Sequence, residues 1–85
     1  MSAVRMPRRA AAVERARRWL LDCGRENAWA YVVRDHDEFG RVAFEVVDRA
    51  EYENHGNEDS CVAALWTYRD DAGQLAVAVE TEADW

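Results

Sequence analysis

The spacing of hydrophobic residues changes once along the chain, near residue 24. In residues 8–23 the apolar side chains recur at the period of a helix, which places six of them within one arc: Ala12, Val13, Ala16, Trp19, Leu20 and Cys23. Pro7 suits the first position of a helix, and Gly24 suits the left-handed residue that follows one. We therefore predict a helix over residues 8–23 that packs on a core through this arc.

Beyond residue 27 the apolar residues alternate with other side chains, which is typical of strands. The alternation predicts four strands, joined in pairs by the turns DHDEFG and DDAG: residues 28–34, 41–47, 61–69 and 74–81. Between the two pairs, Asp48 and Glu51 form the pattern of a helix start, and Gly56 suits the end. We predict a short helix over residues 49–55; the alternative is that the second strand continues through Tyr52.

The predicted fold is α+β, with one long N-terminal helix on a four-stranded, mostly antiparallel sheet built from two hairpins. Residues 1–85 form a single domain, in which we expect residues 1–7 to be flexible. The sequence has no run of about 18 apolar residues and no apolar segment of a secretory signal, so we expect a cytoplasmic protein that does not bind membranes. Cys23 and Cys61 are then expected to be thiols, with one disulfide as the alternative.

Alternation also divides the strand residues into two sets. The set with the large side chains is the expected core: Trp29, Tyr31, Val33, Val42, Phe44, Val46, Val62, Ala64, Trp66, Tyr68, Leu75, Val77 and Val79. The opposite set is small and apolar where a solvated face would carry charge: Ala30, Val32, Ala43, Val47, Ala63, Leu65, Ala76 and Ala78. Because exposed apolar patches mark interfaces, we predict that the second set binds a partner protein or closes a homodimer. The alternative is that the short helix and the twist of the sheet cover it.

Charge is distributed unevenly along the chain, which has a net charge of −6. Residues 1–25 hold seven of the eleven arginines and only two acids, whereas residues 26–85 hold four arginines and fifteen acids. The acids gather in the turns and in the middle connection: Asp35, Asp37, Glu38, Glu51, Glu53, Glu58, Asp59, Asp70 and Asp71. If the first and last turns lie at one end of the sheet, these residues form an acidic rim that attracts a basic surface.

These features favour a small, non-enzymatic protein-binding module. In its most concrete form, the module is an inhibitor or adaptor whose acidic rim occupies a basic, nucleic-acid-binding surface of a target protein. Small acidic phage proteins that block defence enzymes offer an analogy of class, without any match of residues. A structural homodimer is one alternative. Direct binding of nucleic acid through Arg8, Arg15 and Arg18 is the other, and it is disfavoured because acids dominate the rest of the chain.

No motif in the chain identifies a reaction. The stretch EYENHGNEDSC combines Glu51, His55, Asp59 and Cys61, but it lacks a second Cys or His at the spacing of a metal site. His36 lies among carboxylates in DHDE, where nothing fixes the geometry of a proton transfer. The four glycines are isolated from one another, so no phosphate-binding loop is present. We therefore predict no catalytic residue, no metal ligand and no cofactor.

Overall fold

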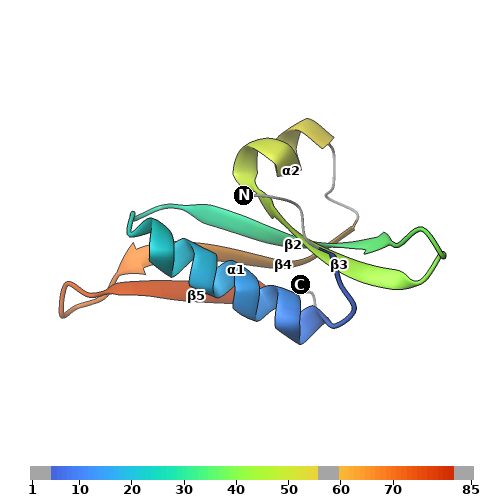
Figure 1. Cartoon of the computed structure of the whole chain (residues 1–85). Coiled ribbons are helices and arrows are strands. Elements are labelled where there is room, and N and C mark those ends of the chain that lie inside the picture. The colour runs from blue at the N-terminus through green and yellow to red at the C-terminus, as the bar shows by residue number, and fades with distance from the viewer. Residues whose placement is uncertain (1–4, 56–59, 82–85) are drawn as a thin grey trace.

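The computed structural model describes residues 5–55 and 60–81. The described elements are β1 (Arg5–Met6), α1 (Arg9–Cys23), β2 (Trp29–His36), β3 (Val42–Asp48), α2 (Arg49–His55), β4 (Cys61–Arg69) and β5 (Leu75–Thr81), shown in Figure 1. The predicted α+β fold and its α-β-β-α-β-β order are confirmed, and the short strand β1 precedes them. Residues 5–6, which were expected to be flexible, pair with β3.

All five strands form one antiparallel sheet in the order β1-β3-β2-β4-β5. β2 and β3 form one hairpin, β4 and β5 form the other, and the pairing of β2 with β4 joins them. Because β2 and β4 run in opposite directions, the two hairpin turns lie at opposite ends of the molecule, as Figure 1 shows. The molecule is elongated, with extents of 46 × 27 × 24 Å.

α1 covers one face of the sheet through small side chains. Ala12, Ala16 and Leu20 are fully buried and pack with strand residues in one cluster: Ala30, Val32, Val46, Val62, Ala63 and Leu65. The short side chains of Ala12 and Ala16 let this part of the helix lie close to the sheet, and Leu20 and Trp19 fill the space beside them. The helix ends at Gly24, which has a φ of 67° and donates its N–H to the carbonyl oxygen of Leu21 at 3.2 Å.

α2 lies on the opposite side of the sheet, where it packs against β2 and β3. The predicted cap is present, because Asp48 Oδ1 accepts a hydrogen bond of 2.8 Å from the N–H of Glu51. Neither helix in the described part of the chain is long and apolar enough to cross a membrane.

The connection between α1 and β2 is fixed by Thr67, whose side chain is fully buried. Its Oγ1 accepts a hydrogen bond from the N–H of Ala28 at 3.0 Å and donates one to the carbonyl oxygen of Arg25. The backbone of Thr67 also bonds to Asn27 and Ala28, at 3.0 Å in each case. These bonds hold the start of β2, and therefore Trp29, against β4.

The β2–β3 turn is organised by one aspartate and one glycine. The N–H of Asp37 donates to the carbonyl oxygen of Arg41 at 2.8 Å, so these two residues face each other across the hairpin. Asp37 Oδ1 accepts from the N–H groups of Phe39 and Arg41, at 2.9 Å each. Gly40 has a φ of 79° and supplies the left-handed residue that bulges the chain at this point.

The β4–β5 turn repeats this geometry. The N–H of Asp70 donates to the carbonyl oxygen of Gln74 at 3.0 Å, and Asp70 Oδ1 accepts from Ala72 and Gln74 at 2.9 Å each. Gly73 has a φ of 77°. In both hairpins the single bulged glycine sets the register, which decides which side chains share a face.

The predicted division of the strand residues into two faces was wrong at both hairpins. Val33 pairs with Glu45 and Trp66 pairs with Ala78, so large side chains of one strand share a face with small or charged side chains of the next. Of the eight residues expected to form an exposed binding face, four are completely buried beneath α1: Ala30, Val32, Ala63 and Leu65. The other four lie on the opposite face, where Ala43 and Val47 are buried and Ala76 and Ala78 are half-buried.

Candidate protein-binding face

The face of the sheet opposite α1 carries a continuous stack of four aromatic rings. Trp66 of β4 stacks on Trp29 of β2 with ring centroids 4.9 Å apart, and Trp29 stacks on Tyr31 at 6.0 Å. Tyr31 in turn stacks on Tyr52 of α2 at 3.9 Å, with an angle of 7° between the planes. We call Trp66, Trp29, Tyr31 and Tyr52 the aromatic stack.

Only part of this face is covered by α2. The four rings of the aromatic stack are half-buried, and Tyr68, which follows on the same face of β4, is 42% exposed. Beside them on β5 lie the small side chains of Ala76 and Ala78, which leave the rings accessible from above. We call the surface formed by Trp29, Tyr31, Trp66, Tyr68, Ala76 and Ala78 the open face.

One guanidinium already lies on the aromatic stack. The Cζ atom of Arg49, on α2, is 5.3 Å from the centroid of the Trp29 ring, which is a cation–π contact. Arg49 Nε also donates to Glu53 Oε1 at 3.1 Å, and this hydrogen bond raises the pKa of the Arg49 guanidinium. The indole ring of Trp29 and the carboxylate of Glu53 therefore both contact the guanidinium of Arg49.

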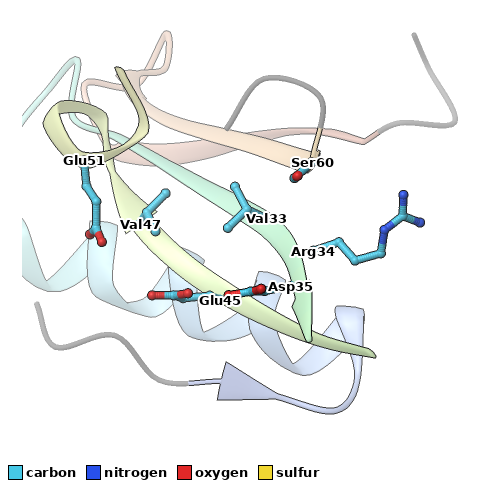
Figure 2. Close-up of a pocket in the computed structure, with 7 residues that line it drawn as sticks. All are labelled: Val33, Arg34, Asp35, Glu45, Val47, Glu51 and Ser60. Atoms are coloured by element: carbon cyan, nitrogen blue, oxygen red, sulfur yellow. The ribbon is translucent and has the colours of Figure 1, made fainter. Parts of the chain in front are cut away.

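A hollow beside α2 adds negative charge to the same side of the sheet. Figure 2 shows Val33 and Val47 at its base, with the carboxylates of Asp35, Glu45 and Glu51 around them, whereas Arg34 points away. Ser60 completes the lining. Among the residues that the structure describes, no group of three His, Cys, Asp or Glu side chains is placed to hold a metal ion.

The nine acids of the predicted rim are not brought together. Asp35, Asp37 and Glu38 lie at the end of the molecule that carries the β2–β3 turn, whereas Asp70 and Asp71 lie at the opposite end. Glu51 and Glu53 lie on α2, and Glu58 and Asp59 fall outside the described residues. The prediction of one rim was therefore wrong, because the antiparallel pairing of β2 with β4 separates the turns. In addition, the carboxylates of Asp37 and Asp70 accept hydrogen bonds from backbone N–H groups of their own turns.

The arginines of α1 lie on the far side of the sheet from the aromatic stack. Arg15 and Arg18 on α1, and Arg8 directly before it, are exposed, since α1 buries its opposite face against the strands. Arg18 Nε donates to Glu14 at 3.1 Å. A nucleic-acid site that used these arginines together with Trp29 or Tyr31 would need both on one surface, and the sheet separates them.

The stretch EYENHGNEDSC lies partly outside the described residues, because residues 56–59 are among those not described. Cys61 is buried at the start of β4, and its Sγ donates to the carbonyl oxygen of Ala63 at 3.3 Å. Burial raises the pKa of the Cys61 thiol. Cys23, which is half-buried, and Cys61 are both free thiols in the structure.

Sequence reasoning missed the open face because it placed Trp29, Tyr31 and Trp66 in the core. The signal that could have found them is the repeated Asp-x-x-Gly turn, which fixes the register of each hairpin and hence the faces. The four residues of the aromatic stack are brought together by two strands and a helix that are distant in the sequence. No protein-family model matches the chain, and no curated protein and no solved structure shows significant similarity to it.

Proposed function

We propose that the protein is a small, non-enzymatic protein-binding module that docks its open face on an arginine-rich surface of a target protein. As an inhibitor or adaptor, it would occupy a basic, nucleic-acid-binding surface of that target. The observation that carries the proposal is the aromatic stack, which lies half-buried on the side of the sheet away from α1.

Aromatic rings in this position are suited to protein contacts. Trp and Tyr supply large contact areas at low entropic cost, and they are enriched among the residues that dominate binding energies. The rings of Trp29 and Trp66 are stacked on each other, so they are held in place before a partner arrives. Ala76 and Ala78 leave room beside the rings for an incoming side chain.

The charge around the open face favours a cationic partner. The carboxylates on this side of the sheet include Asp35, Glu45, Glu51, Glu53 and Glu80, and the guanidinium of Arg49 lies among them. The whole chain carries a net charge of −6, which adds long-range attraction for a basic surface. The position of Arg49 between Trp29 and Glu53 is an internal example of the contact that we expect from the target.

The test uses two peptides of equal length and charge, one of eight arginines and one of eight lysines, titrated while tryptophan fluorescence is followed. We expect tighter binding of the arginine peptide, since guanidinium groups stack on aromatic rings better than ammonium groups do. Tyr68→Ala and Glu80→Gln should each weaken that binding by about fivefold, which corresponds to about 1 kcal/mol.

The matched control is Leu21→Ala on α1. Leu21 is 36% exposed, close to the 42% of Tyr68, and it lies on the other side of the sheet, so its removal should leave peptide binding unchanged. Equal affinity for the two peptides, or an equal effect of Leu21→Ala and Tyr68→Ala, would contradict the proposed function.

A further inference from the structure

Among the described strands, β5 forms a long edge of the sheet. At the other edge, β1 contributes only two residues and is followed directly by Pro7. β5 pairs with β4 on one side, and no described strand pairs with its other side. Residues 74–79, QLAVAV, contain no charge, no proline and no glycine, so this edge lacks the features by which proteins usually prevent edge pairing.

The hydrogen bonds of the β4–β5 hairpin show which backbone groups of β5 point outward. The bond between Asp70 and Gln74 makes these residues a hydrogen-bonded pair, and such pairs recur at every second residue along an antiparallel ladder. The backbone groups of Ala76 and Ala78 therefore point toward β4, and those of Leu75, Val77 and Val79 point away. Thr67, the partner of Val77 in the register, agrees with this pattern, because its backbone bonds toward β2 instead.

We propose that this edge pairs antiparallel with the same edge of a second copy of the chain, with the two-fold axis at Val77. In this register Val77 faces Val77 of the second copy, and Leu75 faces Val79. This register pairs all five residues 75–79 of one copy with the same five residues of the other copy. The outward backbone groups of these residues supply about six hydrogen bonds between the copies, and the two sheets become one sheet of ten strands.

The side chains suit this register. Val79 is 40% exposed and packs against Leu75 of the second copy on the face that carries α1. On the open face Ala76 lies opposite Ala78, where both side chains are small. Glu80 lies opposite the neutral amide of Gln74, so no two carboxylates of the described strand face each other.

The pairing has a consequence that distinguishes it from binding through the open face. A two-fold axis perpendicular to the sheet keeps both open faces on the same side, so a dimer presents two adjoining docking surfaces. Each copy carries a net charge of −6, so salt screens the repulsion between the copies and strengthens the dimer. Salt weakens binding of a basic peptide to the open face, so the two associations respond to salt in opposite directions.

Two variants with equally exposed side chains test the surface, with native mass measured by light scattering over a range of protein and salt concentrations. Wild type should approach twice 9.8 kDa as the protein concentration rises, and more readily at high salt. Val79→Lys should raise the dissociation constant of the dimer at least tenfold, whereas Tyr68→Lys, at 42% exposure on the open face of β4, should leave it unchanged. A wild type that stays monomeric at every concentration, or a dimer that is lost in Tyr68→Lys and kept in Val79→Lys, overturns the proposal.

The register is tested by disulfide trapping in a Cys23→Ser background, in which Cys61 remains buried. Ala76→Cys mixed with Ala78→Cys should give a cross-linked heterodimer on oxidation, because these positions face each other across the two-fold axis. Each variant alone should cross-link at least tenfold more slowly, since neither position faces itself. Equal cross-linking of the single variants and of the mixture contradicts pairing centred on Val77. The cross-linking experiment does not use Val79→Lys, so it tests the proposal even if that variant fails to fold.

Discussion

Replacement of Leu65 by alanine tests which face of the sheet lies beneath α1. Leu65 is completely buried in the cluster formed with α1, so Leu65→Ala removes apolar volume from the centre of the core. Fully buried Leu→Ala substitutions cost about 2–5 kcal/mol, and the cost rises when the cavity cannot collapse. The helix residues in the same cluster include Ala12 and Ala16, whose short side chains cannot swing into the space, so we expect about 3–4 kcal/mol.

This loss of stability is a large share of the total free energy of unfolding. Small domains have about 0.05–0.15 kcal/mol of stability per residue, which for 85 residues is about 4–13 kcal/mol. In a domain of this size 1 kcal/mol lowers Tm by about 4–8 °C, so Leu65→Ala should melt at least about 12 °C below wild type. Urea unfolding followed by circular dichroism measures the free energy of unfolding directly.

The control for this substitution is Tyr68→Ala on the same strand. Tyr68 faces away from α1 and is 42% exposed, so its truncation should cost no more than about 1 kcal/mol. If Tyr68→Ala destabilised the protein as much as Leu65→Ala, or more, the reasoning that places α1 on the Leu65 face would be refuted.

Three further predictions concern single side chains. Thr67→Val removes both hydrogen bonds of a buried hydroxyl, so it should cost about 2 kcal/mol and speed amide exchange at the start of β2; an unchanged urea midpoint would contradict the network. The hydrogen bond from Arg17 lowers the pKa of Glu14 from 4.5 to about 2, so the stabilisation by this carboxylate is complete above pH 4.5 and is lost as the pH falls toward 2. Glu14→Gln should therefore be less stable than wild type at neutral pH and equal to it near pH 2, and a difference that did not change with pH would rule this out. Burial raises the pKa of the Cys61 thiol, so iodoacetamide should modify the half-buried Cys23 first in the native protein and both cysteines equally in urea; mass spectrometry of the two peptides decides, and equal native rates would show that Cys61 is accessible.

The elements of this fold could be predicted from sequence because their signals are local. Gly24 ends α1 in the left-handed conformation that its position in the sequence predicts. Asp48 caps α2 as the spacing to Glu51 indicates, and α2 covers the predicted residues 49–55. Each of these signals acts within four residues of the chain, so no knowledge of the tertiary structure is needed to interpret it.

The faces of the sheet could not be obtained in the same way. Alternation shows which residues of one strand share a side, but it does not relate one strand to the next. That relation depends on the turn, where Asp37 faces Arg41 and the left-handed Gly40 adds one residue to the loop. A loop longer or shorter by one residue would place Phe44 on the same face of the sheet as Tyr31, which is the arrangement that alternation alone predicts. The side of the sheet on which each β3 residue lies therefore depends on this turn.

The aromatic stack was missed for a second reason, which concerns helix packing. Large apolar side chains usually form the core, so Trp29 and Trp66 were expected to face α1. α1 instead packs through Ala12 and Ala16, which suit a close approach to small strand residues. The large rings stack on one another and on Tyr52 of α2 instead.

The pairing of β2 with β4 also has a consequence for the order of folding. Each hairpin closes through a short turn, but the ladder between the hairpins joins residues as distant in sequence as Trp29 and Trp66. Because closing a long loop costs more chain entropy than closing a short one, we expect the hairpins to form early and this ladder to form late. The two indole rings stack across that ladder at 4.9 Å, so their fluorescence should report the late step in which the two halves of the sheet join.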